Sequence, residues 1–471
     1  MQLFGRQGIS AGTYALLALF VSPADFGLMT LAGVFVNLAV VLGDLGFGAA
    51  IVQRKEMADQ ELSTIFAVNM ALASVLAAVG IMGSGLAAEL LHEPRLAAII
   101  VCLCSTLPLT AVSAVQFNIL TRQMRFRELA IRDIVAGLLG GGVALILAAN
   151  GQGVWSLVIQ VLTSSVVGAV LVWRASAWRP KMSLVCLGSL RDISPFSLKM
   201  FVFSLLKFTV QNVDKYLVGR WLGVPALGIY VFAQRVVIAP VNGVVGAIGN
   251  YLFPRFARKQ EDVVALRGDY RIIIALTLGG ILPALLAAGI LARTLIERIF
   301  GPEWASAATL VQILALAAFG QAITSPIGQM MKALGKAGWL VSWTIVINAL
   351  TTAGVTVGVI YGTLEAVAIG WTVTYLIGTL VSVVILSVLL GIRWSAFGRD
   401  FFPLIATIGC SVIYYCIQYA RNGLPDDILS SAVLVSILTI AVVLAGWCCV
   451  PVREAWRRRA WHGLLLSSSS S

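Results

Sequence analysis

Hydrophobic stretches of membrane-spanning length follow one another along nearly the whole chain, and basic residues are concentrated in alternate connections between them. Twenty-two of the 33 Lys and Arg residues fall in the loop after every second stretch or in the C-terminal tail, and only four fall in the other loops. Short basic loops resist translocation and stay on the cytoplasmic side. The pattern predicts an all-α polytopic membrane protein with both termini in the cytoplasm.

The composition agrees, because 59% of the residues are hydrophobic and only 11% are charged, against roughly 45–50% and about 25% in soluble domains. A spanning helix needs about 20 apolar residues. We predict about fourteen transmembrane helices, at residues 2–21, 27–50, 62–86, 96–118, 129–149, 153–173, 194–220, 225–252, 270–291, 304–328, 337–360, 364–390, 401–419 and 428–450.

Several function classes are disfavoured by what the sequence lacks. The net charge of +12 follows largely from the basic cytoplasmic loops, so it indicates no nucleic-acid partner. The two histidines and seven cysteines show no metal-ligand spacing, and no G-x-x-x-x-G-K-[ST] phosphate loop is present. The predicted external loops are too short for a catalytic domain. We therefore expect no enzyme, no metal and no cofactor, apart from a coupling H⁺ or Na⁺.

The chain contains an internal repeat. Residues 26–54 align without a gap with residues 227–255, at an offset of 201, and residues 90–103 resemble 299–314. Both copies begin on the cytoplasmic side, so the repeat is parallel, and a substrate site is expected between the halves. The predicted domains are an N-terminal six-helix lobe at 1–190, a C-terminal six-helix lobe at 191–391, appended helices 13 and 14 at 392–452, and a basic cytoplasmic tail at 453–471.

The same offset places Arg6 on Lys207. Lys207 lies near the middle of its predicted helix, whereas Arg6 is close to the start of the chain. Either the first helix sits shallow in the membrane or native residues precede Met1, and we expect the second.

Seven cations lie inside the predicted spans, where an unpaired charge costs at least ~3 kcal/mol. Snorkelling toward headgroups explains those near helix ends. Together with the acids, the intramembrane candidates are Arg6, Asp44, Arg132, Asp133, Lys199, Lys207, Asp214, Lys215, Arg220 and Arg235.

Lys207, Gln211 and Asp214 are spaced i, i+4 and i+7, so they share one face of a helix. That face must meet protein or a water-filled cavity. Either Lys207 and Asp214 form a structural pair or the face lines a substrate cavity, which we favour. Arg235, about two turns into the next helix, either lines the same cavity or pairs with Asp214 or Asp44.

The sign of the intramembrane charge separates substrate classes. Seven cations against three acids (Asp44, Asp133 and Asp214) leave an excess of positive charge. An exporter of organic cations should show the reverse, because like charges repel strongly at low dielectric. The excess suits a phosphate-bearing or carboxylate-bearing substrate, and arginine binds phosphate in a bidentate manner. Asp44, between Gly43 and Gly46, could bind a coupling proton or Na⁺, or make a helix-end hydrogen bond.

Several segments carry a family resemblance: SPADFGLMTLAGVF (22–35), DLGFGAAIVQRKEMADQELSTIF (44–66), RFRELAIRDIV (125–135), GVWSLV (153–158) and NVDKYLVGRWLGVPALGIYVFAQR (212–235). Together they resemble the polysaccharide transporter (Wzx-like) flippases of the multidrug/oligosaccharidyl-lipid/polysaccharide superfamily. The resemblance implies alternating-access translocation of an undecaprenyl-diphosphate-linked oligosaccharide from the cytoplasmic to the periplasmic leaflet of the bacterial inner membrane. This activity would serve exopolysaccharide, capsule or O-antigen synthesis.

The resemblance also implies site residues and partners. Arg235 and Asp214 become the foremost substrate-binding candidates, with Arg6 at the matching position of the first lobe. Lys207 and Gln211 are candidates because they share a helix face with Asp214. The partners would be the polyprenyl-diphosphate-linked glycan, membrane lipids and a polysaccharide polymerase or export complex. Helices 13 and 14 would form a groove for the lipid tail.

Other functions remain open from the sequence. A cation-coupled multidrug or metabolite exporter of the same superfamily would favour an acid-rich cavity. A membrane glycosyltransferase or polysaccharide polymerase would need acidic catalytic groups near a sizeable loop. A purely structural scaffold would gain nothing from buried Lys207 and Arg235.

Overall fold

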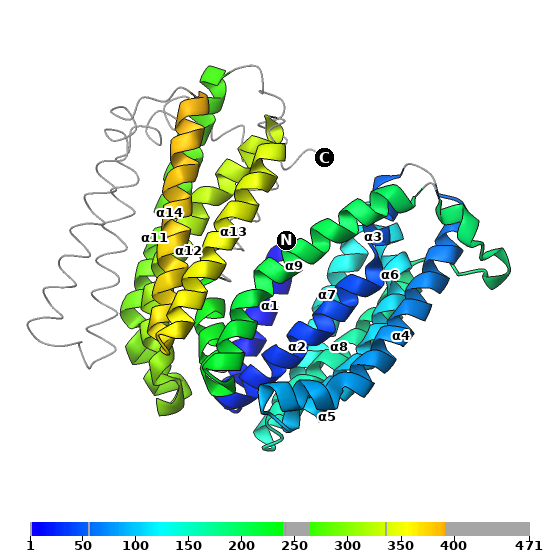
Figure 1. Cartoon of the computed structure of the whole chain (residues 1–471), viewed down its shortest axis with the longest axis horizontal. Coiled ribbons are helices and arrows are strands. Elements are labelled where there is room, and N and C mark those ends of the chain that lie inside the picture. Colours follow the sequence, from blue (N-terminus) through cyan, green and yellow to red (C-terminus); the bar gives the residue numbers. More distant parts are fainter. Residues whose placement is uncertain are drawn as a thin grey trace, which may run out of the picture. The chain divides into compact units, whose positions relative to one another are not determined.

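The computed structural model describes residues 2–54, 57–191, 193–238, 241, 263–334 and 337–390, and these residues form helices joined by short turns, without a strand (Figure 1). Eight of the described helical stretches are long and apolar enough to cross a membrane. The predicted all-α polytopic membrane fold is confirmed. Predicted helices 13 and 14, the appended segment 392–452 and the tail 453–471 lie outside the described residues.

The chain forms two compact units, Met1–Val231 and Phe232–Ser471. The lobe boundaries that the repeat predicts, at 190/191 and 391/392, stay predictions. The first unit contains α1 (Gln2–Leu17), α2 (Pro23–Asp44), α3 (Phe47–Gln53), α4 (Asp59–Leu91), α5 (Arg95–Cys104), α6 (Thr106–Arg122), α7 (Phe126–Ala149), α8 (Val154–Ala175), two 3-10 turns (Met182–Leu184 and Leu187–Leu190) and α9 (Ser194–Trp221).

Two spans predicted as single helices are divided. The predicted helix 27–50 breaks between α2 and α3 because Leu45 and Gly46 take left-handed backbone angles, with φ of 47° and 77°. The Asp44 carboxylate then accepts a hydrogen bond from the Gly48 amide at 3.2 Å, which caps the start of α3. The predicted helix 96–118 is interrupted only at Ser105, the single residue between α5 and α6, whose Oγ donates to the Cys102 carbonyl at 2.6 Å. Arg95–Arg122 still forms one stretch of spanning length.

The second unit contains α11 (Val263–Phe300), a 3-10 turn (Pro302–Trp304), α12 (Ala305–Ala333), α13 (Ala337–Ile360) and α14 (Leu364–Leu390). The helix Val224–Ile238, here called the Val224 helix, runs from the end of the first unit into the second. Glycines bring α13 and α14 together, because a Cβ on Gly354 would lie 2.7 Å from the Gly370 carbonyl oxygen. Small residues drive helix association in lipid.

The second match of the repeat has a structural counterpart. In the first unit, the 33-residue α4 ends at Leu91 and is followed by His92, whose φ is 56°, and Pro94 precedes α5. In the second unit, the 38-residue α11 ends at Phe300 and is followed by Gly301, whose φ is 89°, and Pro302 begins the next turn. A long helix followed by a left-handed residue and a proline therefore occurs at the same place in both copies.

The two segments of the first match of the repeat contact each other where α2 packs against the Val224 helix. A Cβ on Gly27 would lie 1.9 Å from the Val224 carbonyl oxygen, and a Cβ on Gly228 would lie 1.8 Å from the Pro23 carbonyl oxygen. The offset of 201 carries Pro23 to Val224 and Gly27 to Gly228. Each glycine therefore contacts the residue that corresponds to the partner of the other glycine, as expected for a contact related by two-fold symmetry.

Replacing Gly27 or Gly228 with alanine should destabilise the protein. The new methyl would collide with a backbone carbonyl, and overpacking costs about 1–3 kcal/mol, whereas the gain in helix propensity is only about 1 kcal/mol. We expect a lower apparent unfolding temperature for each detergent-purified variant. Gly83→Ala is the matched control, because nothing lies within 4 Å of a Cβ there. Equal unfolding temperatures for all three variants would contradict the close crossing.

Candidate functional site

Helix α9 is the polar helix of the first unit. It has 28 residues, enough for about 42 Å of helix, yet it is absent from the eight apolar spanning stretches. Its charged residues are Lys199, Lys207, Asp214, Lys215 and Arg220. A helix of this length and polarity is typical of one that faces a polar route through a membrane protein.

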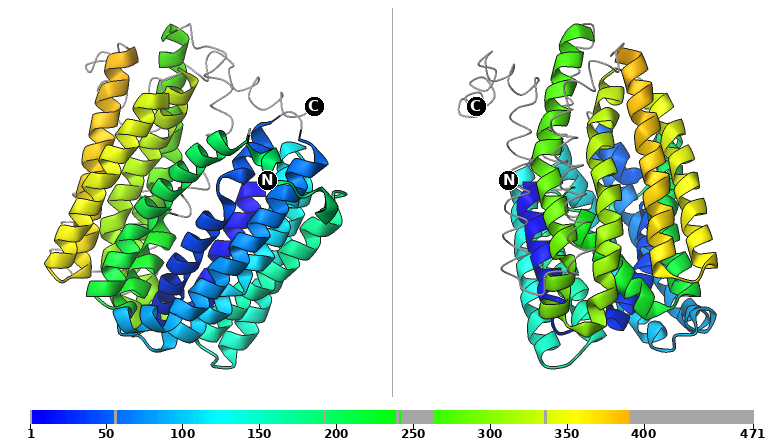
Figure 2. Two further views of the ribbon diagram at one scale, coloured as in Figure 1. Left: turned by 45° about the vertical axis from the view of Figure 1, so that its right-hand side comes forward. Right: turned by 90° about the vertical axis from the view of Figure 1, so that its left-hand side faces the viewer.

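Helix α9 runs along α2 (Figure 2) and is held near both of its ends. A Cβ on Gly46 would lie 2.2 Å from the Ser197 carbonyl oxygen, and a Cβ on Gly219 would lie 2.7 Å from Leu31 Cδ2. The buried residues of α9 are Ser197, Val218 and Gly219. Its middle, from Leu198 to Leu217, therefore has no buried residue.

The predicted face of α9 lies within this uncovered middle. Lys207 and Gln211 are exposed and Asp214 is half-buried. Among the described residues Lys207 forms no ion pair, so the alternative of a Lys207–Asp214 pair is not seen there. The roles of these three side chains in binding a substrate stay predictions.

Asp214 is fixed by a residue that sequence reasoning missed. The fully buried Tyr230 donates a hydrogen bond from Oη to Asp214 Oδ2 at 3.2 Å. The Lys215 amide donates to Asp214 Oδ1 at 2.8 Å. Lys215 itself turns back on α9, where Nζ donates to the Gln211 carbonyl and to Asn212 Oδ1, each at 3.0 Å. Both oxygens of the carboxylate are thereby oriented.

Arg235 and Arg6 lie on the helices that the sequence predicts for them. Arg235 is an exposed residue of the Val224 helix, in the second unit. Arg6 lies in the first turns of α1, and its side chain is outside the described residues. The cationic cavity that would combine Arg235, Arg6 and the α9 face therefore stays a prediction.

Asp44 makes the helix-end hydrogen bond that was one of its two predicted roles, through the capping contact with Gly48. The amide of Asn118 is close by, because a Cβ on Gly48 would lie 2.9 Å from Asn118 Nδ2 and 3.1 Å from Asp44 Oδ1. Among the described residues no group of three His, Cys, Asp or Glu side chains could hold a metal ion. Ion coupling through Asp44 stays a prediction.

Arg132 has a structural environment. It pairs with Asp133 at 2.9 Å and lies 5.4 Å above the Phe117 ring. A Cβ on Gly168 would be 3.1 Å from its Nε, so the guanidinium packs closely against α8. These contacts stabilise the packing of α6, α7 and α8.

Two solved structures align with this fold over most of the chain. The lipid II flippase MurJ in an inward closed conformation aligns with a TM-score of 0.71 at 13% sequence identity, over 95% of this chain and 97% of that one. An inward-facing multidrug resistance transporter of the MATE family aligns with a TM-score of 0.62 at 16% identity, over 83% and 95% of the two chains. At these identities the likeness establishes the fold alone.

Sequence comparison identifies relatives along most of the chain. The succinoglycan biosynthesis transport protein ExoT of Rhizobium meliloti (strain 1021) is 26% identical over 406 residues, which is 85% of this chain and 79% of that protein. The lipopolysaccharide biosynthesis protein WzxC of Escherichia coli (strain K12) is 24% identical over 386 residues, which is 80% of this chain and 76% of that protein.

A family described as "Polysaccharide biosynthesis protein" matches residues 16–309, which is more than half of the 471-residue chain. With the helical membrane fold and the relatives above, this match confirms the resemblance that the sequence segments carry. The chain belongs to the polysaccharide biosynthesis protein family, as a Wzx-like polysaccharide transporter.

Proposed function

We propose that this protein is a flippase that moves an undecaprenyl-diphosphate-linked oligosaccharide repeat unit from the cytoplasmic to the periplasmic leaflet of the bacterial inner membrane. Alternating access of its two repeat-related lobes would carry the unit across, for exopolysaccharide, capsule or O-antigen synthesis. The observation that carries the proposal is α9, a charged helix of spanning length that is packed at its ends and uncovered along its middle.

The chemistry of such a substrate fits a polar helix in an apolar protein. A diphosphate and its sugars cannot cross hydrocarbon unaided, whereas a polyprenyl tail can stay in the lipid. Burying charge is costly, so a route for the head group needs cations and hydrogen-bonding side chains. Lys207 and Gln211 supply one of each from the middle of α9, and Arg235 would add a bidentate phosphate contact.

The names of similar proteins support the same substrate class. ExoT is a succinoglycan biosynthesis transport protein, WzxC is a lipopolysaccharide biosynthesis protein, and MurJ is a lipid II flippase. MurJ has the same fold and flips lipid II, and the names of ExoT and WzxC place them in polysaccharide biosynthesis. Transport of a lipid-linked glycan would account for both. Coupling to H⁺ or Na⁺ at Asp44, and transfer of the unit to a polymerase or export complex, belong to the proposal.

The alternative of a multidrug exporter has the same fold, since a MATE transporter also aligns. The sign of the charge favours the flippase. The charged side chains of α9 are four cations and one acid, and such an excess repels an organic cation while attracting a diphosphate.

Replacing Arg235 with glutamine should abolish export, because glutamine lacks the charge and the paired donors that would bind a diphosphate. The variant is expressed in a strain that lacks the chromosomal gene, and surface polysaccharide and lipid-linked intermediates are measured. We expect complete repeat units to accumulate on the cytoplasmic leaflet while protein abundance is unchanged.

The control for this variant is Arg293→Gln, because Arg293 forms an exposed ion pair with Glu297 at 3.1 Å within α11. Normal export by Arg235→Gln would remove Arg235 from the site. Accumulation of incomplete sugars in the deletion strain would indicate a transferase and contradict the flippase.

Replacing Tyr230 with phenylalanine should impair transport by about tenfold or more, because the hydrogen bond that orients Asp214 is lost and bonds to charged groups contribute about 1.5–3 kcal/mol. Export is measured as before, at matched protein levels. Tyr361→Phe is the control, since Tyr361 is 77% exposed. An unimpaired Tyr230→Phe variant would show that the orientation of Asp214 is irrelevant to transport.

A further inference from the structure

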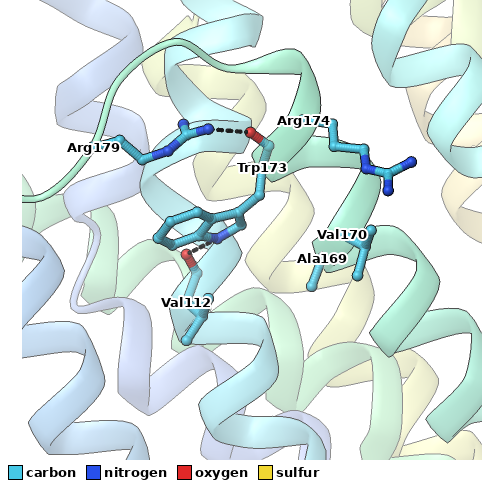
Figure 3. Close-up of a pocket in the computed structure, with 6 residues that line it drawn as sticks. All are labelled: Val112, Ala169, Val170, Trp173, Arg174 and Arg179. Atoms are coloured by element: carbon cyan, nitrogen blue, oxygen red, sulfur yellow. Dashed lines mark hydrogen bonds between the residues drawn. The ribbon is translucent and has the colours of Figure 1, made fainter.

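A pocket lies at the end of α8, and none of its lining residues belongs to α9. It has a volume of about 350 Å³ and is lined by Val112, Ala169, Val170, Trp173, Arg174 and Arg179 (Figure 3). Val112 comes from α6, the next four residues come from α8, and Arg179 comes from the connection between α8 and α9. The pocket therefore has an apolar floor on two helices and a basic rim.

The rim is built by hydrogen bonds. Trp173 Nε1 donates to the Val112 carbonyl at 3.0 Å. Arg179 Nη2 donates to the Trp173 carbonyl at 3.0 Å, and Nη1 donates to the Ser176 carbonyl at 2.6 Å. The Arg179 guanidinium carbon also lies 5.2 Å from the centre of the Trp173 ring. One positive charge and one indole are thus held in place before any ligand arrives.

The lining of the pocket contains two arginines and no acidic residue. Asp59 at the start of α4 pairs with Lys181 at 2.6 Å. Among the described residues, neither Arg174 nor Arg179 forms an ion pair. Arg174 is exposed, and in Figure 3 its guanidinium points away from Arg179. The two arginines bracket the apolar floor.

The pocket continues as an apolar strip on the outer face of α8. Val166 and Val170 are each 46% exposed, and with Arg174 they are spaced i, i+4 and i+8, so they share one helix face. Helix α8 is one of the candidate spans, and Arg174 lies in its last turn. The strip therefore lies at hydrocarbon depth and the arginines at the membrane boundary, on the cytoplasmic side that the loop charges predict.

We propose that this pocket binds a resident phospholipid with an anionic head group from the leaflet at this end of α8. Its phosphate lies at the arginine rim, where Arg174, which forms no ion pair within the described part of the chain, offers its guanidinium and Arg179 adds a fixed positive charge. One acyl chain lies along Val170 and Val166, and Trp173 sits at the head-group level, as interfacial tryptophans do. The lipid is a structural ligand and not the transported substrate, so the inference does not rest on the proposed function.

The test measures bound lipid on the full-length protein by native mass spectrometry, after equilibration with phosphatidylglycerol or with phosphatidylethanolamine. We expect wild-type protein to retain phosphatidylglycerol in preference to phosphatidylethanolamine. Arg174→Gln should lower the retained phosphatidylglycerol by about fivefold, the effect of one basic residue near an anionic lipid. Arg191→Gln, which removes an exposed cation of the same connection, should leave the retention unchanged.

A second variant separates the pocket from general charge attraction. Val170→Trp keeps every charge and obstructs the apolar strip, and it should also lower phosphatidylglycerol retention. Equal losses in Arg174→Gln and Arg191→Gln, or equal retention of the two lipids by wild-type protein, would overturn the proposal. A competition experiment with undecaprenyl diphosphate gives a further criterion. If this compound displaces the bound phospholipid from wild-type protein but not from Arg174→Gln, the pocket belongs to the substrate route and the proposal is overturned.

Discussion

Close approach of backbones at glycine positions fixes how several of the described helices pack. Inside a bilayer, apolar side chains gain nothing by leaving lipid for protein, so helices associate through tight packing and hydrogen bonds. The reciprocal Gly27 and Gly228 contact joins α2 to the Val224 helix, and Gly46 lets α9 pass directly over the break after α2. The α9 helix can leave its polar middle uncovered because these end contacts fix its course.

The order and the helical nature of the described spans could be predicted from hydropathy and loop charge, since lipid permits only a small set of structures. The divisions within the second and fourth predicted spans could not. Leu45 adopts a left-handed angle that leucine rarely takes. Ser105, the residue between α5 and α6, keeps helical backbone angles. Neither residue changes the mean hydropathy of a twenty-residue window enough to mark a break in the helix.

The candidate site divides in a similar way. A helical period of 3.6 residues placed Lys207, Gln211 and Asp214 together on α9, and the structure has all three in that helix. Tyr230 was missed because its contact with Asp214 depends on the chain reversal between α9 and the Val224 helix, where Gly223 takes a φ of 90°. The sequence identifies the arginines at the end of α8 only as loop charge, because their hydrogen bonds to carbonyl groups cannot be inferred from residue spacing.

The reciprocal glycine contact has a consequence for how the two copies of the repeat can diverge. Elsewhere, most positions of one copy can drift without regard to the other, since their neighbours differ. At the reciprocal contact, each glycine packs against the residue that corresponds to its own neighbour in the other copy. A larger side chain in one copy would therefore also disturb the packing of the other copy. The two copies of the repeat have little sequence identity left. We therefore expect the remaining identity to be concentrated at the positions where the two copies contact each other.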